Sequence, residues 1–376
     1  MSVNPTFLSN TKAAKPKVHF RFIDGLRGIA AFWVLLFHAD PDGRISQLTS
    51  TLPTFFVDVV FRRGNWGIAI FFVISGFVMA YSLRNAKIDF NYLKNFAIRR
   101  FVRLSPPYYL SIILTIALTF VASKTIGIAF EPMGEPLSLQ RFFAHLFYVQ
   151  DLFKLPHIQE VYWTLCLEVQ FYFLYFFLLS LAKWLDSSWK LPWTRAAVFI
   201  PPALLTVLFP IGVFPFDGRP TTILPLLYSF LLGVFAYWTW RENLKPLWFY
   251  SYCTLLLSVG IINSLGFVVT CVIVAILILQ VARANRMQDL LNWGWLQFLG
   301  KISYSLYLNH AFIIGGTYLV GYKLLGRSIW SEFICLMLGI SISLAFSTIM
   351  WHLVEKPSMK QSQNIKIVNS NKTLGA

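Results

Sequence analysis

Charged residues are scarce in this sequence. Of its 376 residues only 13% are Asp, Glu, Lys or Arg, and the acidic residues number 16, whereas a soluble domain carries about 25% charged residues. Hydrophobic residues make up 57% of the chain, and Phe alone occurs 36 times. A composition this poor in charge excludes an ordinary soluble globular protein and predicts one that crosses the membrane several times.

Several motifs that would indicate a particular chemistry are also absent. The sequence has no histidine boxes or cysteine clusters suited to a metal centre, no G-x-x-x-x-G-K-[ST] phosphate loop and no G-x-S-x-G nucleophile turn. Its four cysteines lie in apolar stretches without zinc-ligand spacing, which is typical of small core residues. We therefore expect no bound metal, no P-loop nucleotide chemistry and no serine-hydrolase site.

Positive charge is the one kind of charge that the chain holds in excess. Lys and Arg number 32 against 16 acidic residues, which gives a net charge of +16. In a soluble protein this excess would indicate nucleic-acid binding, but in a membrane protein basic residues flank the helices on their cytoplasmic side. We therefore expect these basic residues to interact with the lipid bilayer, and we expect no nucleic-acid partner.

Ten hydrophobic runs approach the roughly 20 residues that cross a bilayer core. They lie at 25–40, 65–83, 104–123, 160–182, 196–214, 221–240, 247–263, 265–282, 302–322 and 331–354. With the N-terminus in the cytoplasm, 23 Lys and Arg fall in cytoplasmic segments and 9 in outer ones, as the positive-inside rule requires. The sequence therefore predicts an all-α polytopic membrane protein with about ten transmembrane helices and both termini cytoplasmic.

The predicted transmembrane domain occupies 19–357, between polar tails at 1–18 and 358–376. Within it, a short apolar segment at 139–153 contains polar side chains and is expected to lie at the membrane interface or to re-enter the membrane. The first run could also be a cleaved signal peptide, but the large residues Phe37 and His38 stand where the cleavage site needs small ones.

The first run carries an ionisable residue at each end, Arg27 and His38. On a helix, eleven residues make almost three whole turns, so both side chains share one face, about 16 Å apart along the axis. Ionisable groups inside a membrane usually face a cavity or the bundle interior. The alternative is that Arg27 reaches the lipid headgroups and His38 only caps a short helix.

A second constellation is "RRFVRLSPPYY", in which Arg100 and Arg103 are three residues apart and share a helix face. Paired guanidinium groups at a membrane mouth can bind a phosphate bidentately, although plain anchoring at the cytoplasmic surface would also explain them. Pro106 and Pro107 are expected to interrupt the helical pattern where the third span begins.

Two further spans contain polar residues in apolar surroundings. Glu168 and Gln170 lie within "WTLCLEVQFYFLY", and Asn309 and His310 within "LGKISYSLYLNH". A membrane carboxylate needs a partner such as a histidine or an arginine, so Glu168 could orient an imidazole or a hydroxyl, or bond to a neighbouring helix. For His310 a packing or hydrogen-bonding role is the simpler interpretation.

Taken together, these motifs resemble the acyltransferase-3 family of bacterial membrane O-acyltransferases. The first-helix signature is similar to "FIDGLRGIAAFWVLLFH", and the second-helix motif to "NWGIAIFFVISGFVMAYS". The later motifs are matched by "RRFVRLSPPYY", "WTLCLEVQFYFLY", "LGKISYSLYLNH" and "VEKP". Each motif alone is a weak signal, but their order on a ten-span hydropathy map is specific, and the resemblance runs from about 20 to 357.

The resemblance implies a reaction and a set of roles. Family members move an acyl group, often acetyl, from cytoplasmic acyl-CoA to a hydroxyl, typically of a lipid-linked or surface glycan. The resemblance implies that His38 is the base or transient acyl carrier, with Arg27 as its partner. It also implies that Arg100 and Arg103 bind the phosphates of CoA. Glu168 would orient His38 or the acceptor hydroxyl. The implied donor co-substrate is acyl-CoA, and the implied location is the bacterial inner membrane.

Some positions depart from the family pattern. Ala69 and Val169 stand where an acidic residue is frequent, and Asn309 stands where Trp is frequent. These are accessory positions, so they blur the subfamily and the acceptor and leave the reaction type unaffected. Some members append an extracytoplasmic hydrolase-like domain that this sequence does not show, and we therefore expect the acceptor to meet the membrane domain directly.

The main alternative is a polytopic transporter or flippase of glycan intermediates, because ten spans and buried polar groups suit it as well. Transporters commonly show internal repeats and paired broken helices, and neither is visible in this sequence. A membrane-bound acyltransferase of the unrelated lipid-modifying type also uses an intramembrane histidine. The order of the R-x10-H and R-x-x-R motifs argues against that type.

Overall fold

The computed structural model describes residues 20–84, 86, 90–127, 129–189, 193–215 and 220–365. Within these ranges the chain forms helices and no strand. The predicted N-terminal tail, 1–18, lies outside the described residues.

All ten predicted hydrophobic runs fall on helices. The main helices are α1 (Arg21–Phe37), α4 (Trp66–Ser82), α5 (Phe90–Ile126), α7 (Trp163–Trp189), α8 (Thr194–Ile211), α9 (Leu227–Trp240), α10 (Pro246–Ile262), α11 (Gly266–Arg283), α12 (Gly294–Leu325) and α13 (Ile329–Met350). The shorter elements between and after them are η1 (Pro41–Gly43), α2 (Ser46–Thr49), α3 (Thr54–Val57), η2 (Asp58–Arg62), η3 (Pro132–Gly134), α6 (Leu139–Leu146), η4 (Glu160–Tyr162), η5 (Leu224–Leu226), η6 (Trp351–Glu355) and α14 (Lys356–Asn364).

Five of the described helices are long and apolar enough to cross a membrane, by length and composition. The number rises to six if the pair Thr54–Arg62 and Trp66–Ser82, bent by 45°, is one span, and two apolar helices, Leu224–Trp240 and Pro246–Ile262, are shorter. The protein is therefore an all-helical, multi-pass membrane protein, and the full number of spans stays a prediction.

Two helix boundaries differ from those the sequence predicts. α5 begins at Phe90 and continues through Pro106 and Pro107, so the prolines do not interrupt it. In a membrane helix, neighbouring groups can satisfy the carbonyls that proline leaves without a partner. At the other end, α14 continues to Asn364 and packs on α5. The first part of the predicted tail 358–376 is therefore helical, and residues from 366 onward lie outside the described ranges.

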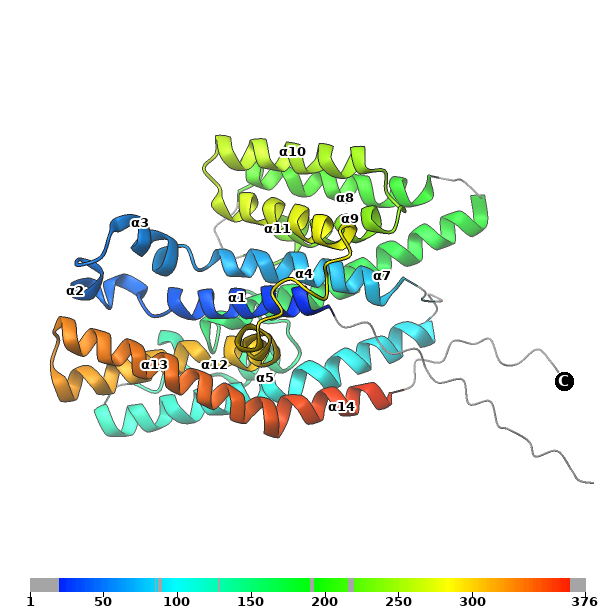
Figure 1. Ribbon diagram of the computed structural model, residues 1–376. Helices are drawn as coiled ribbons and strands as arrows, with labels where there is room; N and C mark the ends of the chain where they lie inside the picture. The colour runs from blue at the N-terminus through cyan, green and yellow to red at the C-terminus, as the bar shows by residue number, and fades with distance from the viewer. Residues whose placement is uncertain are drawn as a thin grey trace, which may run out of the picture.

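The bundle is organised around α1 and α4, which run side by side through its middle (Figure 1). On one side α4 packs against α9 and α11, and on the other α1 packs against α12, which in turn packs against α13. Glycines allow the closest crossings, because a Cβ at Gly76 or Gly233 would overlap the backbone of the facing helix. Gly76 and Gly233 therefore allow α4 and α9 to pack closely.

Candidate active site

His38 lies at the C-terminal end of α1, where the helix stops and the chain turns into the segment that carries α2. Its Nδ1 is 2.9 Å from the carbonyl oxygen of Val34, one turn earlier in the same helix, and its side chain is 11% exposed. The apolar face of α1 packs this end of the helix into the bundle. The ring is therefore held in one orientation with a small accessible edge.

A second histidine faces His38 from α12. Nε2 of His310 lies 3.2 Å from Nδ1 of His38, with the two rings edge to face and their centroids 4.8 Å apart. The other ring nitrogen of His310, Nδ1, is 3.0 Å from the carbonyl oxygen of Leu306. His310 is completely buried, and its ring also lies beside that of Tyr307, with the ring centroids 5.9 Å apart.

The carbonyl contacts assign the protons of this histidine pair. A carbonyl oxygen can only accept, so the proton of neutral His310 lies on Nδ1 and its Nε2 is an acceptor. Nδ1 of His38 then carries a proton, which it donates toward Val34 and His310. This arrangement makes Nε2 of His38 the atom with the lone pair. A neutral imidazole with its lone pair at an accessible edge is suited to act as a general base.

A carboxylate faces that same edge of His38. Oε2 of Glu160, in the short helix η4 just before α7, is 4.0 Å from Nε2 of His38. At this distance the carboxylate would favour a positive charge on the imidazole after it accepts a proton. The side chain of Glu160 is 39% exposed, against 11% for that of His38. Sequence analysis missed Glu160, although its position directly before the "WTLCLE" span could have drawn attention to it.

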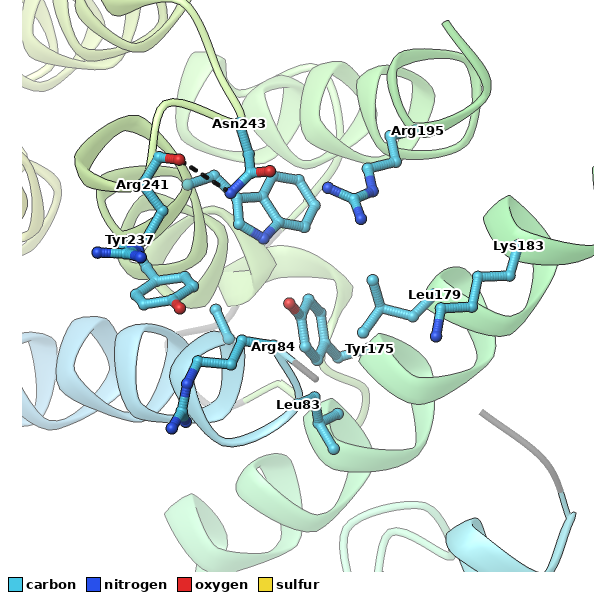
Figure 2. A pocket seen from close by; sticks show the side chains of 11 residues that line it. Leu83, Arg84, Tyr175, Leu179, Lys183, Arg195, Tyr237, Arg241 and Asn243 are labelled. Atoms are coloured by element: carbon cyan, nitrogen blue, oxygen red, sulfur yellow. Dashed lines mark hydrogen bonds between the residues drawn. The ribbon is translucent and has the colours of Figure 1, made fainter. Parts of the chain in front are cut away.

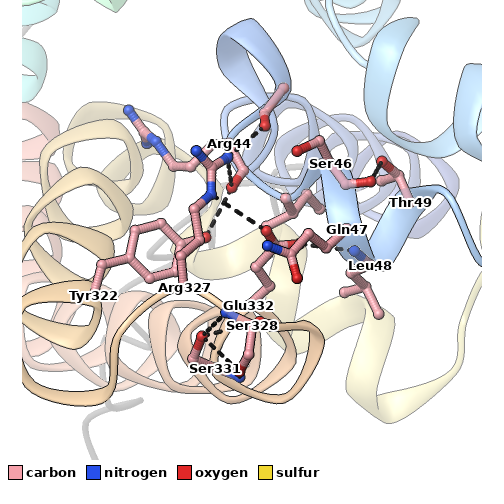
Figure 3. A network of polar contacts seen from close by, with 12 residues as sticks. Arg44, Ser46, Gln47, Leu48, Thr49, Tyr322, Arg327, Ser328, Ser331 and Glu332 are labelled. Atoms are coloured by element: carbon pink, nitrogen blue, oxygen red, sulfur yellow. Dashed lines mark hydrogen bonds and ion pairs between the residues drawn. The ribbon is translucent and has the colours of Figure 1, made fainter.

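A polar network braces the segment that follows His38 (Figure 3). Glu332 at the start of α13 is fully buried; its Oε2 accepts a hydrogen bond of 2.7 Å from the backbone N–H of Leu48, and its Oε1 is 3.5 Å from Nε of Arg327. Arg327 also donates to the carbonyl of Gly43 at 2.9 Å, and the hydroxyl of Tyr322 donates to that of Arg44 at 2.8 Å. The chain after His38 is thus tied to α12 and α13.

Arg27 lies toward the other end of α1, in a different cluster. Together with Arg103 of α5 it acts electrostatically on the carboxylate of Glu355. That carboxylate accepts hydrogen bonds from the hydroxyl and the backbone N–H of Ser305, at 2.6 and 3.2 Å. Glu355 thus lies within electrostatic range of an arginine from α1 and one from α5.

Arg100 and Glu168 meet through a tyrosine. The hydroxyl of Tyr172 donates a short hydrogen bond to Glu168 and lies 3.4 Å from Nη1 of Arg100, whose guanidinium group also sits 4.7 Å from the centre of the Tyr172 ring. The hydroxyl of Ser75 donates to Glu168 at 3.0 Å. Glu168 therefore joins α4 to α7 and, through Tyr172, to Arg100.

The predicted interfacial segment 139–153 forms α6 and a turn. α6 begins at Leu139 because the Ser138 hydroxyl accepts from the backbone N–H of Arg141. Arg141 is 2% exposed and donates to several loop carbonyls, including that of Pro156 at 2.8 Å. His145 bonds the carbonyl of Arg141 and accepts from the N–H of Ile158, and burial lowers the pKa of His145 to about 4. These residues have a structural role.

The predicted site residues thus separate into two groups. Arg27 and Arg100 each lie within electrostatic range of Arg103, with Glu168 attached to Arg100 through Tyr172. His38 stands apart from them, with His310 and Glu160. Within the described ranges, no three side chains of His, Cys, Asp or Glu converge as metal ligands do. The arginines could hold the anionic part of a co-substrate.

Comparison with known proteins shows which family this chain resembles. A family model described as "Acyltransferase domain", of the acyltransferase-3 type, matches residues 20–352. YrhL of Bacillus subtilis (strain 168), named as a candidate peptidoglycan O-acetyltransferase, is 24% identical over 91% of the chain. The peptidoglycan O-acetyltransferase OatA of Listeria monocytogenes is 28% identical over 44% of the chain.

The similarity covers only part of each relative, 56% of YrhL and 25% of OatA, so the chain spans about half the length of the first. No solved structure matches the chain. The family model nevertheless covers nearly every described helix, from the start of α1 to η6. The chain therefore belongs to the acyltransferase-3 family.

Proposed function

We propose that this protein is an integral-membrane O-acyltransferase that moves an acyl group, acetyl in the simplest case, from acyl-CoA to a hydroxyl of a glycan or glycolipid. The observation that carries the proposal is the histidine pair: Nδ1 of His38 points to Val34 and His310, so its Nε2 carries the lone pair and faces the edge beside Glu160. A positioned neutral imidazole is what removal of a hydroxyl proton requires.

The proposed topology is the one that the charge distribution predicts. Ten spans with both termini in the cytoplasm put 23 of the 32 Lys and Arg on the cytoplasmic side. In this topology α1 starts at Arg21 on the cytoplasmic side and runs outward through the membrane. The arginine cluster then lies toward the cytoplasm, and His38 lies toward the outer side. In this arrangement the protein lies in the bacterial inner membrane. Acyl-CoA enters from the cytoplasmic surface of that membrane, and its thioester extends through the protein to His38.

In direct transfer, Nε2 of His38 accepts the proton of the acceptor hydroxyl while the hydroxyl oxygen attacks the thioester carbonyl carbon. Collapse of the tetrahedral intermediate breaks the bond between carbon and sulfur, and the leaving thiolate takes the proton from the imidazolium. Between these steps the imidazolium faces the carboxylate of Glu160, which stabilises the positive charge. The products are the acyl ester and CoA thiol.

In a two-step route, Nε2 of His38 itself attacks the thioester carbonyl carbon, the bond between carbon and sulfur breaks, and CoA leaves as a thiolate beside an acyl-imidazolium. The acceptor hydroxyl then attacks the acyl carbon, the bond between that carbon and Nε2 breaks to restore the neutral ring, and the hydroxyl proton balances the charge of the CoA thiolate. Both routes need the lone pair on Nε2 and the proton on Nδ1, and His310 helps to orient that proton in either case. Mass spectrometry of the peptide that carries His38, after incubation with acetyl-CoA alone, separates the two routes.

The arginine cluster is proposed as the donor side of the site. Arg100 and Arg103, together with Arg27, provide three guanidinium groups from two helices, with Arg27 and Arg100 each within electrostatic range of Arg103, which suits the phosphates of CoA. The contacts of Glu168 with Tyr172 and Ser75 favour a role in positioning Tyr172 and Arg100 over one in orienting His38.

The proposed acceptor is a glycan because both relatives carry the name of a peptidoglycan O-acetyltransferase. A glycan would approach the accessible edge of His38 beside Glu160, which is the more exposed member of the pair. A soluble peptidoglycan fragment is therefore the first acceptor to test.

The test is transfer of radiolabelled acetyl from acetyl-CoA to such a fragment by purified protein, with His38→Ala and His38→Gln as variants. We expect wild-type transfer and a loss of about 10²–10⁴-fold in both variants, at unchanged yield in the membrane and unchanged thermal midpoint. Retained transfer in a folded variant would remove the chemical role of His38. Absence of transfer and of acetyl-CoA hydrolysis by the wild type would favour a flippase.

A further inference from the structure

A separate cavity of 370 Å³ opens between the ends of α4, α7, α8 and α9 (Figure 2). It lies at the end of the bundle where α1 begins, because Phe20, just before α1, packs edge to face on Tyr81 and Trp240 beside it. His38 stands at the opposite end of α1, about 25 Å away along a helix of 17 residues. The cavity is therefore distinct from the histidine site.

Four cationic side chains from four helices or helix ends line this cavity: Arg84, Lys183, Arg195 and Arg241. All four residues are exposed. In the part of the chain that the structure describes, no carboxylate oxygen lies within 4.0 Å of their cationic groups. Cations collected in a concave site repel one another unless an anion joins them.

Backbone carbonyl groups orient two of these cations. Nη1 of Arg84 donates to the carbonyl of Tyr81 at 2.6 Å, and Nζ of Lys183 donates to the carbonyl of Ala86 at 2.5 Å. Carbonyl oxygens fix the side chains without cancelling their charge. Each guanidinium group keeps further N–H donors, and the ammonium group keeps two. These donors remain for an anion with several oxygens.

The inner wall of the cavity is aromatic. Tyr175, Tyr237 and Trp238 line it and are buried, and the guanidinium group of Arg195 lies 5.9 Å from the ring centre of Trp238. Figure 2 shows the aromatic rings between the arginines of α8 and α9 and the end of α4. Flat apolar walls under a cationic rim match a ligand that carries phosphate groups and a ring or chain beside them.

We infer that this cavity binds the phosphate groups of a phosphate-bearing ligand. If the proposed donor is right, on which this step rests, the nucleotide head of acyl-CoA supplies such phosphates. The cavity is a near neighbour of the arginine cluster, since Tyr175 at its wall follows Tyr172 by three residues on α7, about one helical turn. The headgroup of an anionic phospholipid has the same phosphate chemistry and is the other source.

Binding measured without any transfer reaction tests this inference. Purified full-length protein in nanodiscs of phosphatidylcholine is titrated with CoA and with adenosine 3′,5′-bisphosphate, for the wild type, Arg195→Gln/Arg241→Gln and Arg283→Gln. Arg283 is the matched control, because it is an exposed arginine at the end of α11 that does not line the cavity. Bound phosphatidylglycerol is measured in parallel by native mass spectrometry.

We expect the double variant to lose at least tenfold in affinity for both nucleotides and the control to stay within twofold of the wild type. Loss of bound phosphatidylglycerol with unchanged nucleotide affinity also supports a phosphate site, with a lipid as its source. Unchanged binding of both kinds of ligand in a folded double variant overturns the inference. Failure of the proposed acyl transfer would appear separately, in the transfer assay of the wild type.

Discussion

The two ends of this bundle are built in opposite ways. At the end that holds His38, side chains are tied to one another: the two histidines and Val34 share hydrogen bonds, and Glu332 and Arg327 hold the following segment. At the other end, four cations line a cavity and, among the described residues, have no carboxylate within ion-pair distance. The first arrangement keeps one ring in place, and the second leaves charge available for a ligand.

Under the proposed function, this difference divides the work between the two ends of the bundle. Proton transfer depends on a fixed geometry, which the histidine end would supply, and recognition of an anion depends on unneutralised donors, which the end with the cationic cavity would supply. Changes at the histidine end should therefore lower the rate of the chemical step, whereas changes at the arginine end should lower affinity for the donor.

Apart from the His38 variants themselves, the largest effect is expected for His310→Ala. This change removes the acceptor that faces Nδ1 of His38, and we expect kcat for transfer to fall about 10²-fold while KM for acetyl-CoA changes little. The matched control is His145→Ala, since His145 is equally buried and also bonds a backbone carbonyl, but lies in the α6 segment. An equal loss of kcat per folded molecule in the control would break the comparison.

An intermediate effect is expected for Arg103→Gln. The change removes one charge from the cluster with Arg27 and Arg100, so KM for acetyl-CoA should rise about tenfold at nearly constant kcat. Arg99→Gln, in the same helix but outside that cluster, is the control. Steady-state kinetics on both variants measure this, and a fall in kcat at unchanged KM would argue against a binding role for Arg103.

The smallest effect is expected for Glu332→Gln. The amide oxygen can still accept from the N–H of Leu48, but the charge that faces the half-exposed Arg327 is lost. Such an ion pair contributes about 1 kcal/mol or less, so the thermal midpoint should fall slightly and transfer about twofold. Exposed Glu131→Gln serves as the control. A complete loss of transfer would contradict this prediction and would show that Glu332 takes part in the reaction itself.

Much of the fold follows from local sequence. Apolar runs predict where helices lie, and the α12 run, predicted at 302–322, falls inside a longer helix. The predicted start of α5 was wrong, because the two prolines suggested a helix boundary. The helix in fact begins earlier and continues through both prolines. Local pattern cannot show that neighbouring groups in a membrane tolerate such prolines.

The candidate site was predictable only where its residues are close in sequence. The spacing of Arg100 and Arg103 and that of Arg27 and His38 can be read from helical periodicity. The partner of His38 is 272 positions away, and the cavity draws its cations from segments that no spacing connects. These contacts depend on which helices pack together, and hydrophobic periodicity does not specify that pairing.

The central claim is that His310 acts on the reaction through His38. A double-mutant cycle with His38→Ala, His310→Ala and the combined variant, measured as acetyl transfer per folded molecule, tests it directly. The account predicts that the combined variant is no slower than His38→Ala alone, because the base through which His310 acts is already absent. Losses that multiply in the combined variant would contradict it.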